Sequence, residues 1–249
     1  MKSYRLLGIH LADISHDEAV ERAREGGLFL APSAPGLCEL AHDTYYQQAL
    51  RDSDLNLADS GLAILLMRLL GLGILQRTSG LGFLRQLLRS EWVKNAGNSF
   101  WVMPNKVDME RNVQWLQAQG CAVSLQDCYI APLYSKSGAV EDHELLSMIK
   151  EHKPLAIFIC TGSGNQEKLG FWLKQNLGYR PLICCIGAAI GFLSGSQVKI
   201  PAWADRFCLG WLFRCVSNPR QFILRYLSAC RLIPLVIRYR MQSPLPRQV

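Results

Sequence analysis

Two short polar segments, each directly behind an apolar run, hold the side chains best suited to chemistry. Asp59-Ser60-Gly61 follows the run Leu55–Leu57 and precedes an apolar helical pattern. A carboxylate at the carboxyl end of a strand can act as a general base that takes a proton from an attacking hydroxyl group. Asp is also a preferred N-cap of an ordinary helix, so the local pattern leaves both interpretations open. Arg77, before the next helical pattern, fits a phosphate contact and an ordinary surface arginine equally well.

The second segment, Thr161–Glu167, follows another apolar run and opens a helical pattern. Gly162 and Gly164 would expose backbone N–H groups at the positive end of a helix, which suits a phosphate group. Gln166 and Glu167 fall in the first turn, within reach of a sugar or nucleotide. Turns of this kind also occur as plain tight turns. The segment lacks the Walker lysine and the full dinucleotide fingerprint, which argues against an NTPase and against NAD binding.

The segment from Lys199 to Val249 carries almost all of the net charge. It holds nine basic residues and one acidic residue, whereas the whole chain has a formal charge of +7. Eight of the nine are arginines, and aromatic residues stand between them. Guanidinium groups fork onto phosphate oxygens, and aromatic side chains favour a membrane–water boundary. The segment therefore predicts a polyanionic ligand, a membrane surface or both, with a solvated basic helix as the alternative.

Composition excludes several classes of protein. With 49% hydrophobic and 19% charged residues the chain is globular rather than disordered. The nine cysteines form no CxxC or zinc spacing, which favours buried, reduced thiols in a cytoplasmic protein. The first residues lack a signal-peptide pattern, and the charge-free stretch 181–198 predicts a buried strand and a turn-rich helix rather than a membrane span. The five histidines show no ligand spacing. We therefore expect a mechanism without a metal ion.

Short β-rich apolar runs alternate with helical patterns along the first four-fifths of the chain. Such alternation predicts an α/β fold, with a Rossmann-like, mostly parallel sheet and helices on both faces. Ligands of such folds bind at the carboxyl ends of the strands. The expected strands are Tyr4–Ile9, Leu28–Ala31, Leu55–Leu57, Ser99–Met103, Ala122–Leu125, Leu155–Cys160 and Leu182–Ile186. The expected helices are 17–25, 36–51, 61–71, 79–91, 107–119, 139–152 and 165–177.

The domain boundary is expected near residue 200, between a core of residues 1–200 and an arginine-rich appendage of residues 201–249. Asn218-Pro219 is a good helix start. On one helix Arg220, Arg231 and Arg238 would share a face, although Pro234 should kink or end that helix. The pattern predicts an amphipathic helix that lies on lipid, or one that folds over the sheet and points arginines into a site.

A set of spaced motifs carries a family resemblance over nearly the whole chain. In the C-terminal part these are Lys199-Ile200-Pro201, Leu209-Gly210-Trp211, Asn218-Pro219-Arg220 and Arg225-Tyr226; upstream they are Asp59-Ser60-Gly61, Arg77-Thr78-Ser79-Gly80 and Gly162–Glu167. With these motifs the chain resembles the WecG/TagA/CpsF family of bacterial glycosyltransferases.

The resemblance implies an inverting transfer of a sugar from a UDP-sugar, which is a substrate and not a cofactor, to a saccharide on a polyprenyl-diphosphate carrier. It implies a peripheral protein at the cytoplasmic face of the plasma membrane, acting in exopolysaccharide or cell-surface polysaccharide synthesis. Asp59 becomes the expected catalytic base. The expected substrate-binding residues are Arg77, Gly162, Gly164, Gln166, Glu167, Arg206, Arg214, Arg220 and Arg225.

Several positions depart from the common family pattern, and they bear on the sugar more than on the reaction. Ala31-Pro32-Ser33 stands where many members have Thr-x-Asn, and Gly210 stands where they have an acid. Pro104-Asn105 replaces a glycine pair, and Lys199 replaces an arginine. These changes resemble the branch of the xanthan-type glucosyltransferase, which favours UDP-glucose as donor. UDP-N-acetylmannosamine or UDP-N-acetylmannosaminuronate is the alternative donor.

Two other function classes remain as alternatives. A non-catalytic adaptor in polysaccharide assembly would use the basic segment to sit on an anionic membrane surface. Nucleic-acid binding would also use arginines and aromatics, but no recognition module is present, and we expect no nucleic-acid partner. Exposed apolar residues in the basic segment would promote homo-oligomers in the absence of membrane.

Overall fold

The computed structural model describes residues 2–198, 200–201, 203–204 and 210–245, and the side chains of Trp211, Arg214 and Gln221 are not described. Its centre is a six-stranded sheet with strand order β4-β3-β8-β7-β5-β6, in which every pairing is parallel. The strands are β3 (Gly27–Leu30), β4 (Leu55–Asn56), β5 (Ser99–Met103), β6 (Cys128–Ile130), β7 (Ala156–Ile159) and β8 (Leu182–Cys185). The predicted α/β class and parallel sheet are confirmed.

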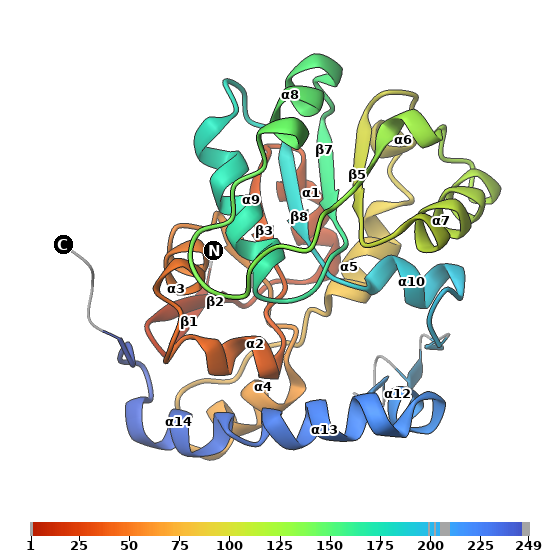
Figure 1. Ribbon diagram of the computed structural model, residues 1–249. Helices are drawn as coiled ribbons and strands as arrows, with labels where there is room; N and C mark the ends of the chain where they lie inside the picture. The colour runs from red at the N-terminus through yellow and green to blue at the C-terminus, as the bar shows by residue number, and fades with distance from the viewer. Residues whose placement is uncertain (1, 199, 202, 205–209, 246–249) are drawn as a thin grey trace.

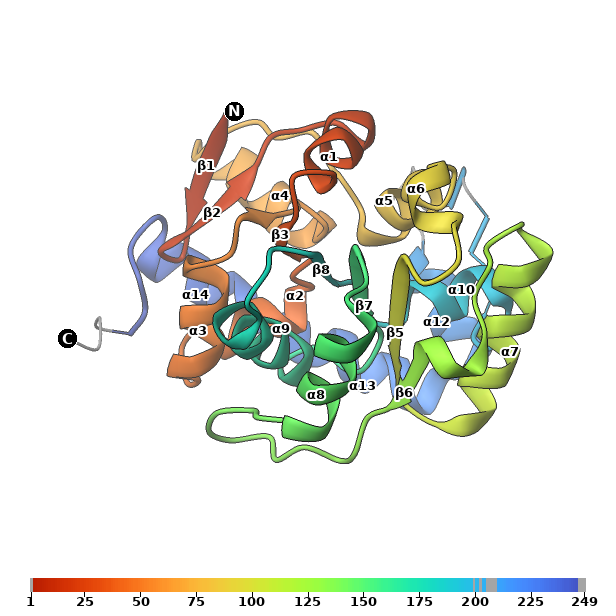
Figure 2. The same ribbon diagram turned by 90° about the horizontal axis from the view of Figure 1, so that it is seen from above.

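Helices cover both faces of the sheet (Figures 1 and 2). One face packs against α1 (His16–Ala23), α5 (Gly80–Leu87), α6 (Glu91–Lys94), α7 (Lys106–Ala118) and α10 (Ala189–Ser194). The other packs against α2 (Ala34–Glu39), α3 (Thr44–Arg51), α4 (Gly61–Leu69), α8 (His143–His152) and α9 (Asn165–Asn176).

The sheet is buried on both faces because successive strand residues point to opposite sides. In β7, Phe158 joins the core on the α5 side, and Ile157 and Ile159 join the core on the α9 side. Trp101 of β5 stacks on Phe158 with ring centroids 4.1 Å apart. Gly170 lets α9 lie close to the sheet, since a β-carbon there would come within 2.7 Å of the Cys185 sulfur. The near-continuous apolar runs of the sequence therefore correspond to strands with no polar face.

Turn chemistry explains where the predicted strands were wrong. The run predicted as one strand from Tyr4 to Ile9 is a hairpin of β1 (Ser3–Leu6) and β2 (Ile9–Ala12), apart from the main sheet. Leu7 and Gly8 both have positive φ, as a two-residue hairpin turn requires. The strand expected at Ala122–Leu125 begins only at Cys128, because Ser124 and Asp127 form a capping box around a short 3₁₀ turn.

Local caps also divide two of the predicted helices. The pattern 36–51 is split into α2 and α3, because the Asp43 side chain accepts a hydrogen bond from the Tyr46 backbone N–H and starts a new helix. The pattern 79–91 is split into α5 and α6. The predicted buried strand and turn-rich helix at 181–198 are confirmed as β8 and α10.

Between residues 210 and 245 the C-terminal segment forms a row of three helices along one side of the molecule (Figure 1). They are α12 (Gly210–Ser217), α13 (Pro219–Ala229) and α14 (Leu232–Tyr239). The predicted break near Pro234 is confirmed, since α13 ends at Ala229 and Pro234 lies in the first turn of α14. Leu232 and Val236 of α14 are fully buried in the core that α2 and α4 share.

The segment that follows α14 is hydrogen-bonded to the turn between β1 and β2. The backbone N–H groups of Leu7 and Gly8 donate to the carbonyls of Arg240 and Met241 at 2.8 and 3.2 Å. The segment predicted as an appendage is thus packed against the core through α14, and the division into two domains stays a prediction.

The remaining predictions about the chain concern thiols and membrane spans. Among the described residues, six cysteines are buried and free, Cys215 is half-buried and Cys230 is exposed. Burial raises the pKa of the Cys128 thiol to about 12. No helix within the described part of the chain combines the length and the apolar character needed to cross a bilayer.

Candidate active site

A cavity of about 700 Å³ opens at the carboxyl ends of β3, β4 and β8, beside α13. Parallel α/β sheets bind their ligands at this edge, and the volume is within the range of small-molecule sites. Polar and charged residues meet there with an apolar wall from α4, α5 and α10. The lining includes Ala31, Ser33, Asp59, Leu62, Leu65, Arg68, Arg77, Leu81, Phe192, Arg225 and Tyr226.

Asp59 is held by the backbone rather than acting as a helix cap. Ser60, not Asp59, is the N-cap of α4, and its hydroxyl accepts from the Ala63 N–H. The Asp59 carboxylate instead crosses to α5, where Oδ1 accepts a hydrogen bond of 3.0 Å from the Gly80 N–H. Gly80 is the first residue of α5, so the carboxylate lies at the positive end of that helix. The interpretation of Asp59 as an ordinary cap is therefore wrong for this structure.

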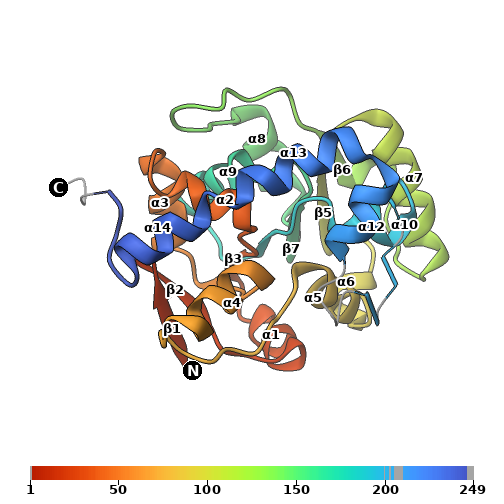
Figure 3. The ribbon, with the colours of Figure 1, turned by 90° about the horizontal axis from the view of Figure 1, so that it is seen from below.

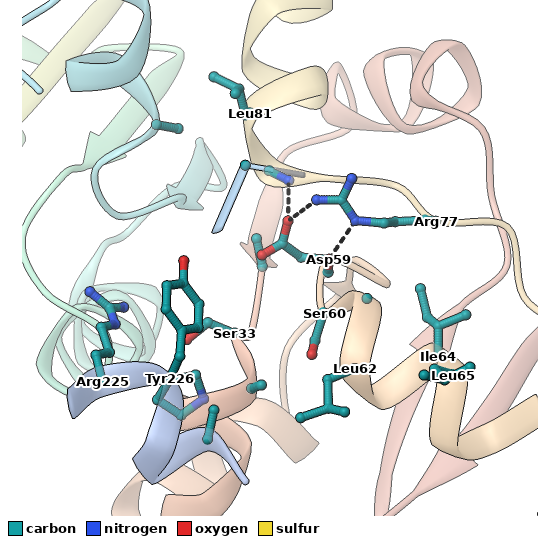
Figure 4. A pocket seen from close by; sticks show the side chains of 18 of the residues that line it. Ser33, Asp59, Ser60, Leu62, Ile64, Leu65, Arg77, Leu81, Arg225 and Tyr226 are labelled. Carbon is teal, nitrogen blue, oxygen red and sulfur yellow. Dashed lines mark hydrogen bonds and ion pairs between the residues drawn. The ribbon is translucent and has the colours of Figure 1, made fainter. Parts of the chain in front are cut away.

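Arg77 contacts both the backbone and the side chain of Asp59. Its Nε donates to the Asp59 carbonyl at 2.9 Å, and its Nη2 lies 3.8 Å from Asp59 Oδ1. The two side chains keep 23% and 27% of their accessible surface, so the pair is partly shielded from solvent. Both drawn contacts of the carboxylate end on Oδ1, and the second oxygen, Oδ2, is turned towards the pocket (Figure 4).

Two further backbone contacts make this corner rigid. The Thr78 N–H donates to the Ala58 carbonyl at 3.1 Å, and the Thr78 hydroxyl donates to the Ile14 carbonyl. Gly80 packs so closely on Ala31 that a β-carbon at Gly80 would lie 2.9 Å from the Ala31 methyl group. The absence of a side chain at position 80 thus lets the start of α5 reach Asp59. We refer to Asp59, Arg77 and Gly80 with their mutual contacts as the Asp59 corner.

Helix α13 supplies the opposite wall. Arg225 and Tyr226 line the cavity on the side away from the Asp59 corner, with the Tyr226 hydroxyl directed into it and Arg225 beyond Tyr226 (Figure 4). The charged lining side chains in the described part of the molecule are Asp59, Arg68, Arg77 and Arg225. Their sum is positive, which suits an anionic ligand such as a diphosphate.

The Gly162–Glu167 turn lies beside the cavity and not in its lining. Ser163 in this turn packs on α2, where a β-carbon at Gly36 would meet its hydroxyl at 2.6 Å. Gly162 and Gly164 have open space around them and no side chain to aim at a ligand. The structure therefore places the predicted phosphate turn next to α2, whose first residues do line the cavity.

Gln166 and Glu167 are buried and use their polar atoms within the protein. Glu167 Oε2 accepts from the Gly164 N–H at 2.6 Å, and Oε1 accepts from Gln166 Nε2 at 3.0 Å. Gln166 Oε1 accepts from the Gly187 N–H at 2.8 Å, which joins the turn to the loop after β8. Burial raises the pKa of Glu167, although the hydrogen bonds that it accepts oppose this. The contact of Gln166 and Glu167 with substrate stays a prediction.

The C-terminal arginines that are predicted to bind substrate fall into three groups. Arg225 lines the cavity, whereas Arg220 is exposed on the same helix and outside the lining. Arg206 and the side chain of Arg214 lie outside the described residues. Within the described residues, no cluster of three His, Cys, Asp or Glu side chains could hold a metal ion.

Sequence reasoning missed several lining residues. Tyr226 occurs among the sequence motifs only beside Arg225, and no motif contains Arg68 of α4. Arg68 Nη2 donates to the Leu75 carbonyl at 3.1 Å, a contact between residues seven apart that fixes the loop after α4. A lone arginine in an otherwise apolar helix is the one sequence signal that could have drawn attention to it.

Comparison with known proteins decides the family. The chain matches the WecG/TagA/CpsF family of glycosyl transferases over residues 4–245, which is nearly its whole length. The chain belongs to this family. It is also similar to an N-acetylglucosaminyldiphosphoundecaprenol N-acetyl-beta-D-mannosaminyltransferase of Bacillus spizizenii, with 22% identity over 236 residues, covering 94% of this chain and 88% of that protein. The WecG/TagA/CpsF resemblance and the prediction of a glycosyltransferase are confirmed.

Proposed function

We propose that this glycosyltransferase moves a sugar from a UDP-sugar to a saccharide carried on a polyprenyl diphosphate, with inversion and without a metal ion. The observation that carries the proposal is the Asp59 corner, a carboxylate held at the carboxyl edge of the sheet and facing the arginine-bearing helix α13. The name of the Bacillus relative, which joins a mannosaminyl unit to a diphosphoundecaprenol-linked sugar, supports this class of acceptor.

In this proposal Asp59 is the general base. An acceptor hydroxyl next to Oδ2 loses its proton to the carboxylate while its oxygen attacks the anomeric carbon from the face opposite UDP. Two contacts at Oδ1, from the Gly80 N–H and from Arg77, keep the carboxylate from rotating. Because the reacting oxygen is held before substrate arrives, little ordering remains for the reaction step itself.

Arginine side chains take the charge that grows on the leaving UDP. Fixed cations stabilise that charge more strongly in a partly shielded site than in open water. Arg77 and Arg225 are the lining arginines among the predicted binding residues. Arg225→Ala should raise the KM for a substrate diphosphate about tenfold, because a charge-assisted hydrogen bond is lost. Arg220→Ala, on the same helix but outside the lining, is the matched control and should change KM much less.

The donor is proposed to be UDP-glucose, with UDP-N-acetylmannosamine or UDP-N-acetylmannosaminuronate as the second candidate. Support for glucose comes from the positions at which the chain departs from the family pattern. Ala31, Ser33 and Gly210 are three of these positions, and all three line the cavity. Support for the second candidate comes from the mannosaminyl unit in the relative's name. The adaptor alternative retains no separate support from the site.

The proposed location is the cytoplasmic face of the plasma membrane, with the exposed arginines of α13, of α14 and of the turn between them against anionic lipid. Arg231 and Arg238 are exposed, and Arg231 Nη2 lies 3.3 Å from His42 Nε2. Arginines close to an anionic surface each contribute about 1 kcal/mol to binding.

A transfer assay tests the reaction and the donor together. Purified protein in detergent is offered UDP-glucose, UDP-N-acetylmannosamine and UDP-N-acetylmannosaminuronate, each with polyprenyl-diphosphate-linked mono- and disaccharides. Transfer from one donor, resistant to EDTA and lost in Asp59→Asn, is the expected result. A folded protein that transfers none of these sugars would overturn the proposal and would favour the adaptor instead.

A further inference from the structure

Helix α4 is apolar on both of its sides although it lies at the surface. Its inner side places Ala63, Ile64 and Met67 in the core. Its outer side carries Leu65 and Leu69, which keep 52% and 72% of their accessible surface. Positions four residues apart lie one above the other on a helix, so these two leucines form one stripe. A helix that is apolar all round is typical of a segment covered on both sides.

The row of C-terminal helices lies beside α4 and also exposes apolar side chains. Figures 1 and 3 both show α4 next to α13 and α14 on the same side of the molecule. Leu224 and Leu227 of α13 and Ile237 of α14 are exposed.

Charge identifies what covers the surface. No Asp or Glu occurs between Gly61 and Ser90, and none follows Asp205. The charged residues within α4, α13 and α14 themselves are therefore all arginines, including Arg68, Arg220 and Arg238. Apolar side chains mixed with cations fit the boundary of an anionic bilayer, where the leucines reach the acyl region and the guanidinium groups meet phosphates. A second copy of the chain would bring arginines against arginines.

Helices α4 and α13 both border the cavity. Leu62, Leu65 and Arg68 of α4 line one side of it, and Arg225 and Tyr226 of α13 line another. A bilayer that touches both helices would thus lie against the cavity. An isoprenoid diphosphate could then present its sugar to Asp59 while its lipid tail stays in the bilayer.

We propose that α4, a helix of the core, is a membrane-contacting element, and that its Leu65–Leu69 stripe enters an anionic lipid surface together with α13 and α14. Only the route of the lipid-linked acceptor rests on the proposed function. The contact with lipid stands without it.

The test compares Leu69→Gln with Leu133→Gln in the full chain. Leu69 does not line the cavity, so its substitution leaves the site intact. Leu133 is the same residue type, fully exposed in the loop between β6 and α8, which Figure 3 shows at the opposite edge of the molecule from α4. Binding is measured by co-sedimentation with vesicles of phosphatidylglycerol and phosphatidylcholine in equal parts. Circular dichroism verifies that both variants are folded.

Leu69→Gln should weaken vesicle binding about five- to tenfold, because an apolar side chain no longer leaves water on binding. Leu133→Gln should bind as the wild type does. Turnover of a water-soluble, short-chain acceptor should be equal in all three proteins. Vesicle binding of Leu69→Gln at the wild-type level would overturn the proposal. So would a change confined to the association state in lipid-free solution, measured by analytical ultracentrifugation, because the stripe would then be an interface between copies. If no protein transfers sugar but Leu69→Gln alone binds lipid poorly, the contact with lipid stands and the proposed function fails.

Discussion

Two turns at the same edge of the sheet, both predicted to meet substrate, use their polar side chains in opposite ways. In the Asp59 corner, backbone groups of α5 and a neighbouring arginine hold a carboxylate whose other oxygen is turned to the cavity. In the Gly162–Glu167 turn, the side chains of Gln166 and Glu167 hold backbone groups instead. In the first turn, backbone contacts hold the Asp59 side chain in position. In the second turn, the side chains of Gln166 and Glu167 hold the backbone in position.

This difference is tertiary in origin. Both turns join a parallel strand to a helix. In the sequence, each is a short polar segment between an apolar run and a helical pattern. Asp59 reaches the N-terminus of a helix that begins 21 residues later, a contact that local spacing does not encode. Glu167 reaches only three residues back, to its own helix start. The Asp59 carboxylate is thus held by a distant helix while Ser60 caps α4, whereas both carboxylate oxygens of Glu167 accept hydrogen bonds within their own turn.

The largest expected effect is that of Asp59→Asn. The amide oxygen can still accept from the Gly80 N–H, so the fold should survive, but an amide cannot take the acceptor's proton. Turnover should fall about 10²- to 10⁴-fold. The assay is sugar transfer at saturating substrate, with Asp108→Asn as control because Asp108 lies in the first turn of α7, outside the cavity lining. Turnover of Asp59→Asn equal to that of the control would remove Asp59 from the reaction.

Arg77→Lys should have the next largest effect. Lysine keeps the charge, but its single ammonium group cannot contact both the carbonyl and the carboxylate of Asp59 as the guanidinium does. We expect kcat to fall about 10²-fold with a smaller change in KM. A change in KM alone would mean that Arg77 binds substrate without shaping the Asp59 corner. Steady-state kinetics over a range of donor concentrations distinguishes the two outcomes.

Much of this architecture could be predicted from the sequence, and the misses share a physical cause. The buried strands β3, β5, β7 and β8 were found because strands covered on both faces read as continuous apolar runs. The start of β6 and the hairpin β1–β2 were missed because Ser124 and the Leu7-Gly8 turn act through local hydrogen bonds and positive φ angles, which hydropathy does not register.

The site shows a different limit. Asp59, Arg77 and Arg225 come together in the cavity as candidate residues from three distant parts of the sequence. Family motifs drew attention to all three, whereas composition suggested only the basic segment. Arg68 was missed because no motif contains it, and its place depends on how α4 packs beside α13. What the sequence lacked at the site was the pairing of segments far apart along the chain.

Gly80→Ala tests whether the Asp59 corner depends on close packing. The added methyl group would meet Ala31 at 2.9 Å, so α5 must shift and its first N–H must move away from Asp59. Overpacking of this kind costs about 1–3 kcal/mol of stability. Turnover should fall about tenfold as the carboxylate loses its fixed position. Gly82→Ala is not a suitable control because it would meet His16, but Gly178→Ala is, since a β-carbon there has open space. Unchanged turnover in Gly80→Ala would show that the corner tolerates movement.

The smallest expected effect on turnover, and the sharpest test of the comparison, is that of Glu167→Gln. Because the folded pKa of Glu167 is raised by burial, its contribution to stability is full below its unfolded pKa and is lost as pH rises through the folded value. The glutamine variant has no such loss. It should therefore be less stable than the wild type by about 1 kcal/mol at acid pH, since one hydrogen bond from Gln166 is lost, and the gap should narrow as pH rises. Urea unfolding at several pH values measures this, while turnover should stay within about threefold of the wild type. A large loss of turnover with no change in stability would instead place Glu167 against substrate, and the two turns would then work alike.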